Sequence, residues 1–116
     1  MTRFNKIAAG LVTLQLGACA MISGDNTRLY ESLNDQDIRL AAATVQQSLE
    51  TAPDQTTRTW SNSVSGRGGS VTPTRTYLSA NGLFCRDYVE ELTSEEGKGS
   101  FHNTACRDDT ERWTWL

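Results

Sequence analysis

The clearest hydrophobic pattern in the chain is a stripe with helical spacing between residues 33 and 53. Its apolar residues recur three or four positions apart, which places them on one face of an α-helix. They are Ile38, Ala41, Ala42, Val45 and Leu49. Asn34 is suited to cap the first turn, Asp37 lies near the positive end of the helix dipole, and Pro53 prevents continuation. The pattern predicts one helix from about residue 35 to residue 51.

Beyond this helix the chain changes to threonine, aromatic and glycine residues, with short polar turns between the runs. Five segments have the composition of β-strands. They are TTRTWSNSV (56–64), SVTPTRTYLS (70–79), LFCRDYVEELT (83–93), SFHNTACR (100–107) and RWTWL (112–116). Strands joined by short turns pair antiparallel, because parallel pairing needs a long crossover. The sequence therefore predicts an α+β fold, in which one N-terminal helix packs on an antiparallel meander of about five strands. In the second strand, Pro73 predicts an edge or a bulge.

A second apolar run lies at the start of the chain, behind a basic beginning. Arg3 and Lys6 precede residues 7–16, which are apolar apart from one threonine and one glutamine. This layout is typical of a bacterial secretory signal, and the run is shorter than the roughly 20 apolar residues that span a bilayer. We expect residues 1–18 to be a signal peptide. A buried N-terminal helix is the alternative.

The run ends in LGAC, residues 16–19, which resembles the lipobox of bacterial lipoproteins. The cysteine thiolate is the nucleophile that accepts diacylglycerol. This resemblance implies cleavage before Cys19 and acylation of that residue, for example with palmitate. Two or three acyl chains anchor firmly, because each buried methylene contributes about 0.8 kcal/mol. The absence of aspartate at Ala20 favours the outer membrane. An ordinary signal with an incidental cysteine is the alternative.

The remaining chain divides into a tether and one small domain. Residues 19–32 are mostly polar and predict a lipidated N-terminus with a short tether, and residues 33–116 predict the domain. The whole chain has a formal net charge of −3, and residues 1–18 contain two basic residues and no acidic one. The mature chain is therefore mildly acidic. This balance argues against nucleic-acid binding, which depends on basic patches.

Apart from Cys19, the chain contains two cysteines, Cys85 and Cys106. In an exported chain such a pair predicts a disulfide, here stabilising by about 3 kcal/mol through a loop of about 20 residues. If the two cysteines lie opposite each other in adjacent strands, residues 95–96 fall at the hairpin tip. A metal pair is the alternative, but with only His102 to assist, the spacing matches no zinc site.

No residue pattern in the sequence predicts catalysis or a cofactor. His102 is the only histidine, and the register of the cysteines places a valine opposite it, so it has no acid–base partner. Glu90 and Glu91 point to opposite faces of a strand, and Glu95 and Glu96 lack the spacing of a calcium loop. The glycines of residues 65–69 and their neighbouring serines match neither a phosphate loop nor a nucleophile elbow.

Aromatic and arginine residues alternate through the strands and define a candidate binding surface, since both types are enriched in binding hot spots. Its members are Trp60, Arg75, Tyr77, Arg86 and Tyr88. The alternative, which we favour, is that the aromatic rings form the core and arginine stems cover it. Trp113 and Trp115 lie on one face of the last strand, as core residues do.

Four stretches of the chain resemble the bacterial seventeen-kilodalton surface antigen family, which are outer-membrane lipoproteins first recognised in rickettsiae. They are TWSNSVSGRGGSVTPTRTY (59–77), FCRDY (84–88), TACR (104–107) and WTW (113–115). The resemblance extends over residues 41–116. Many members carry a glycine zipper before the domain, and this chain has none. The resemblance implies a location and a fold, and no catalytic activity.

The sequence therefore predicts a non-enzymatic outer-membrane lipoprotein with a structural or binding role in the cell envelope. Its expected partners are membrane lipid, through Cys19, and an envelope protein, peptidoglycan or lipopolysaccharide. The alternative is a periplasmic inhibitor or accessory subunit, for example of lysozyme-type enzymes. In that case SGRGG (65–69) or SEEGKG (94–99) would enter the enzyme cleft.

Overall fold

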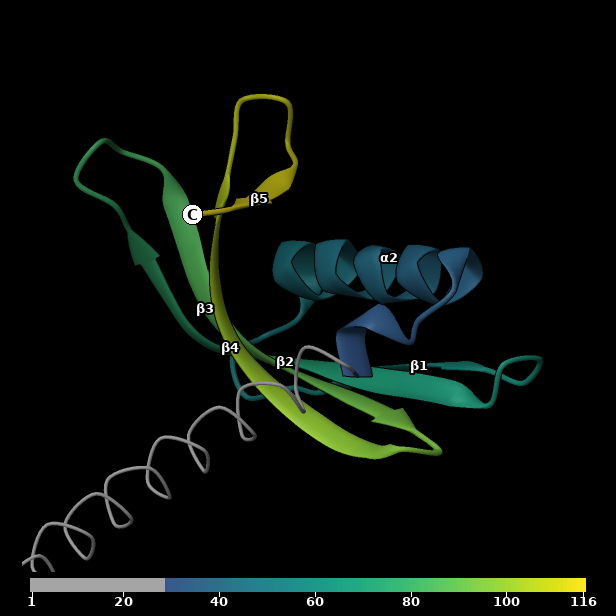
Figure 1. The fold of residues 1–116 in the computed structure, drawn as a ribbon. Helices are drawn as coiled ribbons and strands as arrows, with labels where there is room; N and C mark the ends of the chain where they lie inside the picture. Colours follow the sequence, from purple (N-terminus) through teal and green to yellow (C-terminus); the bar gives the residue numbers. More distant parts are fainter. Residues whose placement is uncertain (1–28) are drawn as a thin grey trace, which may run out of the picture.

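One long helix lies across one face of a five-stranded sheet in the computed structural model, which describes residues 29–116 (Figure 1). The strands follow one another across the sheet in the order β1-β2-β3-β4-β5, and all neighbours are antiparallel. The elements are α2 (Asp35–Thr51), β1 (Arg58–Asn62), β2 (Arg67–Leu78), β3 (Phe84–Ser94), β4 (Gly97–Arg107) and β5 (Trp113–Trp115). The predicted helix and the five antiparallel strands are confirmed.

The first turn of α2 is fixed by a capping box. The Asn34 side chain accepts a hydrogen bond from the Asp37 backbone N–H at 2.8 Å, and the Asp37 carboxylate accepts one from the Asn34 N–H at 3.0 Å. These two bonds satisfy backbone groups that a helix start otherwise leaves free. The buried stripe of α2 consists of Asp37, Ala41, Val45, Ser48 and Leu49. Ile38, predicted to belong to it, is 44% exposed, so the stripe is rotated relative to the prediction.

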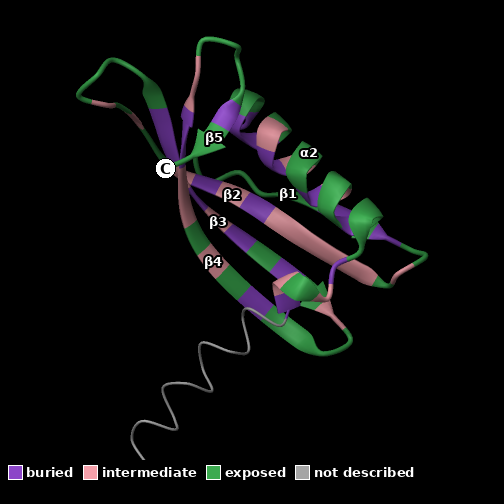
Figure 2. Cartoon of the chain, turned by 45° about the horizontal axis from the view of Figure 1, so that its top comes forward, coloured by how far each residue is buried: buried purple, intermediate pink, exposed green. Residues whose placement is uncertain are grey.

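The side chains of α2 and the sheet form the core, and the strands alternate between buried and exposed positions (Figure 2). One cluster lies around Tyr88 and Leu49, and a second lies around Trp60 and Leu92. Gly69 lies opposite Trp60 in the register of β1 and β2. A Cβ at Gly69 would lie 2.6 Å from Trp60 Nε1 and 2.5 Å from a backbone oxygen of β3. Glycine is therefore needed there to admit the indole ring.

The disulfide joins Cys85 of β3 to Cys106 of β4, and the two residues are register partners, as predicted. The hairpin between these strands turns at residues 95–96, which confirms the predicted tip. In β2 the register shifts between Pro73 and Arg75, which confirms the predicted bulge. β1 is too short to pair with this part of β2, so the missing N–H of proline disturbs no ladder there.

The last residues of the predicted tether lie against the domain. Residues 29–31 are helical, Leu29 is buried, and the Tyr30 ring meets Phe101 edge-on with centroids 5.8 Å apart. The predicted signal peptide, Cys19 and the earlier part of the tether lie outside the described residues. Within residues 29–116, none of the helices has the length and apolar character needed to cross a membrane.

Candidate functional site

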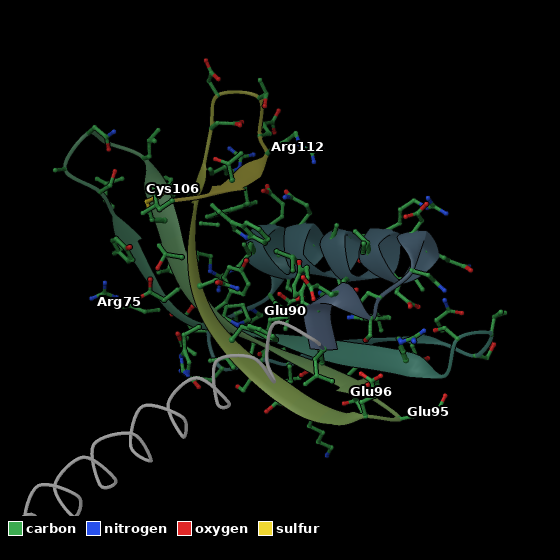
Figure 3. All side chains as sticks on the ribbon, viewed as in Figure 1. Arg75, Glu90, Glu95, Glu96, Cys106 and Arg112 are labelled. Atoms are coloured by element: carbon green, nitrogen blue, oxygen red, sulfur yellow. A yellow bond between two sulfur atoms is a disulfide. The ribbon has the colours of Figure 1, made fainter. Side chains whose placement is uncertain are left out.

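The five residues of the candidate binding surface do not lie together. Trp60, Arg86 and Tyr88 are buried on the α2 side of the sheet, with exposed fractions of 7%, 6% and 1%. Arg75 and Tyr77 lie on the opposite face, where the Arg75 guanidinium stacks 4.2 Å from the centre of the Tyr77 ring. Figure 3 shows Arg75 pointing away from α2. The register explains the separation. Arg75 and Tyr77 pair with Asp87 and Cys85 of β3, and register partners share a face of the sheet. These two positions alternate along β3 with Arg86 and Tyr88, so they face the other side.

Arg86 has a structural environment. Its guanidinium donates hydrogen bonds to the carbonyl oxygens of Ser48 and Leu49, at 3.3 and 2.8 Å, and to the Asp54 carboxylate at 2.8 Å. The last carbonyls of a helix lack partners within the helix, and a cation beside them is favourable. Arg86 therefore fastens the C-terminal end of α2 to β3, and it is not available to a ligand.

The structure instead forms a cavity of about 240 Å³ between α2, β3, β5 and the segment before α2. Its walls are mainly apolar and aromatic. They comprise Tyr30, Ile38, Ala41, Ala42, Val45, Gln46, Trp113 and Trp115, and Glu90 completes the lining. Ile38 and Ala42 are exposed residues of α2 because they form the rim of this opening. Because α2 is rotated in this way, its buried face leaves a cavity beside the core.

Among the described residues, Glu90 is the one carboxylate in the cavity lining. Its side chain lies in the middle of β3, facing α2, and only 2% of the residue is exposed (Figure 3). Among residues 29–116 no hydrogen bond or ion pair reaches its carboxylate. Burial raises the pKa of Glu90 to about 7, since a charged carboxylate is disfavoured away from water. A buried acid of this kind is unusual, because buried charges are normally paired.

The aromatic walls of the cavity are held in place by polar contacts. Gln46 of α2 clamps the backbone of Trp113, with its amide N–H donating to the carbonyl at 2.7 Å and its oxygen accepting from the N–H at 3.0 Å. The Trp115 indole N–H donates to the Tyr88 hydroxyl at 2.6 Å. Trp115 is 62% exposed, so its predicted place in the core is wrong, and it forms part of the cavity wall. β5 is thereby fixed against α2.

Two tyrosines respond to the same environment. Burial raises the pKa of Tyr30, and the neighbouring charge of Glu90 raises it further. Burial also raises the pKa of Tyr88 to about 12, although the hydrogen bond from Trp115 acts in the opposite direction. Both hydroxyls therefore remain neutral at physiological pH, and Glu90 is the group of this cluster that titrates near neutrality.

The other sequence candidates lie elsewhere. His102 faces away from α2 opposite Val89, as the register predicted. Glu95 and Glu96 form the tip of the β3–β4 hairpin, remote from Glu90 (Figure 3). The described residues contain no group of three His, Cys, Asp or Glu side chains placed to hold a metal ion. The two segments proposed for enzyme inhibition form hairpin ends, and their role in inhibition stays a prediction.

In the sequence analysis Glu90 was considered only as a possible partner of Glu91 and was set aside, although a signal for a buried Glu90 exists. It occupies the middle of the pattern Tyr88-Val89-Glu90-Glu91-Leu92, so it shares a face with two residues of core type. Period-2 alternation predicts that this glutamate points inward. The presence of a cavity around it depends on α2 and β5, which are distant in the sequence.

Comparison with known proteins places this chain near one family. Residues 47–114 match the family model described as "17 kDa outer membrane surface antigen". The chain is 36% identical over 81 residues to the 17 kDa surface antigens of Rickettsia conorii and Rickettsia rickettsii, covering 70% of this chain and 51% of each relative. It is 39% identical over 75 residues to that of Rickettsia australis, covering 65% and 49%. The chain spans about half the length of these relatives. No solved structure matches it.

Proposed function

Because the chain belongs to the 17 kDa outer membrane surface antigen family, we propose that it is a lipid-anchored outer-membrane protein whose domain binds a ligand of the cell envelope. The observation that supports a binding role is the Glu90 cavity, whose described lining is mostly apolar and aromatic and includes one carboxylate. The ligand would come from an envelope protein, peptidoglycan or lipopolysaccharide.

A binding role fits the cavity better than catalysis does. Proton transfer and covalent catalysis usually require a nucleophile or second acid–base group within hydrogen-bond reach of the first. The described lining residues offer one carboxylate and a tyrosine that stays neutral, and the family is described as a surface antigen. We therefore propose a non-enzymatic protein.

The proposed anchor is Cys19, which follows the lipobox-like residues 16–18. Labelling cells with a palmitate analogue and separating the membranes tests it. We expect the wild-type chain to take up label and to enter the outer-membrane fraction, and Cys19→Ser to lose both properties. Ala20→Asp is a matched control in an enterobacterial host, because it keeps the label and moves the protein to the inner membrane. A labelled or membrane-bound Cys19→Ser protein would contradict the anchor.

The proposed binding role is tested in living cells with a photo-crosslinking amino acid at Ala42, on the exposed rim of the cavity. The matched control carries the same amino acid at His102, which is exposed on the other face of the sheet. We expect a discrete crosslinked product at Ala42 that disappears when Glu90→Gln is added. Identical products from both positions would contradict a ligand at the cavity.

A further inference from the structure

We infer that the Glu90 cavity binds an organic ammonium group, that is, a protonated amine carried on an apolar stem. This inference names the ligand class for the binding role proposed above and rests on it. Three features of the cavity carry the inference: the charge of its carboxylate, the absence of a cation in the described lining, and the aromatic and aliphatic character of its walls.

The first step concerns charge. The Glu90 carboxylate is almost wholly buried, and the described lining residues include no lysine, arginine or histidine. Three described arginines near α2 are engaged elsewhere, since Arg67, Arg86 and Arg107 pair with Asp37, Asp54 and Glu50. Two others, Arg58 and Arg112, line a different pocket beside α2. A buried carboxylate is stabilised by a cation or by several hydrogen-bond donors. Here the described residues supply neither, so a ligand that brings both is the complementary one.

The second step concerns the number of donors. A primary ammonium has three N–H donors and a full positive charge. Glu90 offers two acceptor oxygens. The Tyr30 side chain lies close to Glu90, since the charge of Glu90 helps to raise the pKa of Tyr30. An alcohol has one donor and no charge, and a carboxylic acid or phosphate would bring a second negative charge into a buried site. The ammonium group therefore fits the acceptors better than these alternatives.

The third step concerns the stem. Ile38, Ala42 and Val45 of α2 give one wall of the cavity aliphatic contacts, and Trp113 and Trp115 of β5 give it indole rings. Aromatic side chains attract cations as well as apolar groups. The cavity volume of about 240 Å³ is below the range of about 300–1,000 Å³ typical of drug-sized ligands. A short alkylammonium group, free or as a lysine side chain, has the matching size.

Calorimetric titration of the purified chain with n-butylammonium chloride tests the inference, with n-butanol as the neutral probe. We expect saturable binding of the amine at pH 8 and weaker binding of the alcohol. Glu90→Gln should weaken amine binding by about tenfold or more, as expected for a lost charge-assisted hydrogen bond, and leave alcohol binding unchanged. Glu91→Gln, an exposed neighbour on the other face, should behave as the wild type.

The pH dependence of the wild-type chain provides a second measurement, which remains available if Glu90→Gln folds poorly. Tyr30 and Tyr88 are the other ionisable groups that face Glu90, and α2 and β5 add none to the cavity lining. Amine binding should therefore weaken as the pH falls below about 7, where Glu90 takes up a proton. Alcohol binding should not change over that interval.

Three results would overturn the inference: no saturable amine binding, equal affinity for amine and alcohol, or a Glu90→Gln variant that binds the amine like the wild type. A second titration with Nα-acetyl-lysine amide separates the two sources of the group. Tighter binding than butylammonium indicates a lysine of a protein or peptide, and weaker binding indicates a free amine. A crosslinked product at Ala42 does not depend on added amine. Failure of these titrations with that product present would therefore remove the ammonium assignment and leave the proposed binding role.

Discussion

Asp37 at the start of α2 and Glu90 in the middle of β3 are both buried carboxylates between helix and sheet, yet their surroundings are opposite. Asp37 accepts hydrogen bonds from the Asn34 N–H at 3.0 Å and from the side chains of Asn62 and Ser65, both at 2.7 Å. The Arg67 guanidinium lies 3.6 Å away. Burial alone would raise the pKa of Asp37, but these partners outweigh it and the pKa is lowered. Glu90 has no such partners among the described residues, and its pKa is raised.

The difference separates a structural acid from a candidate functional one. The partners of Asp37 come from the cap of α2 and from the β1–β2 hairpin, so its carboxylate joins two elements that are about 25 residues apart in sequence. Among residues 29–116 the Glu90 carboxylate has no hydrogen-bond or ion-pair partner, and a buried charge without a partner lowers stability. Burial of a carboxylate is therefore not by itself a sign of function, and the donors around it decide between the two roles.

Removing the Asp37 carboxylate, which accepts several hydrogen bonds, should have the largest effect on stability. We expect Asp37→Ala to lower the free energy of unfolding by about 3–4 kcal/mol, because it leaves several buried donors without an acceptor. Asp35→Ala, which changes an exposed acid in the same first turn, is a matched control with an expected loss below about 1 kcal/mol. Denaturant unfolding at pH 7 measures both. Equal losses would show that the Asp37 network contributes little.

Replacing the Glu90 carboxylate with a neutral amide should raise the free energy of unfolding, in contrast to the change at Asp37. The pKa of Glu90 in the folded chain, about 7, is above its ordinary value of 4.5, so the folded state retains the proton over that interval. The free energy of unfolding therefore falls as the pH rises from about 4.5 to 7 and then levels off. We expect Glu90→Gln to be more stable than the wild type by about 2–3 kcal/mol at pH 8.

At pH 4.5 and below, where Glu90 is protonated in the folded chain, this advantage should largely disappear. Denaturant unfolding at the two pH values, with Glu91→Gln as the exposed control, measures the difference. A Glu90→Gln variant that is less stable than the wild type at pH 8 would show that the carboxylate has a partner in the chain, and the contrast with Asp37 would be lost.

Much of the architecture followed from local sequence, but the contrast between the two acids did not. The helix over residues 35–51, the order of the strands and the cysteine register all rest on periodicity and turn signals. Periodicity shows which residues share a face of a helix, but it does not show how the helix is rotated on the sheet. Ile38 was therefore expected inside and Asp37 was treated only as an acid near the positive end of the helix dipole, whereas the structure buries Asp37.

The same limit applies to the candidate site. Arginine and aromatic residues were grouped by type, but Arg86 is buried because the C-terminal carbonyls of α2 lie above it, a contact across 38 residues of sequence. The Glu90 cavity depends in a similar way on where β5 meets α2, through Gln46 and Trp113. Local patterns indicate inward and outward positions, and only the assembled elements show which inward position has room beside it.

A smaller change at the Asp37 site tests whether its neutral donors matter singly. Ser65 donates to the Asp37 carboxylate at 2.7 Å and accepts a hydrogen bond from the Arg67 N–H at 3.2 Å. We expect Ser65→Ala to lower the free energy of unfolding by about 1.5 kcal/mol, the usual range for a hydrogen bond to a charged group. Ser63→Ala, an exposed neighbour in the same hairpin, should change it by less than about 0.5 kcal/mol.

The smallest effect on stability is expected from Arg67, the cation that lies beside Asp37 in the described part of the chain. The Arg67 side chain is partly exposed and its ion pair is long, at 3.6 Å, so Arg67→Met should lower the free energy of unfolding by only about 0.5 kcal/mol. Unfolding in low and high salt measures this contribution, with Arg75→Met as a control at an exposed ion pair. A loss larger than that of Ser65→Ala would show that a cation, rather than neutral donors, keeps Asp37 ionised. If Arg67→Met loses as little stability as expected, neutral hydrogen-bond donors are enough to keep the buried Asp37 carboxylate ionised. Glu90 lacks such donors among the described residues, and the ammonium ligand proposed above would supply donors and charge together.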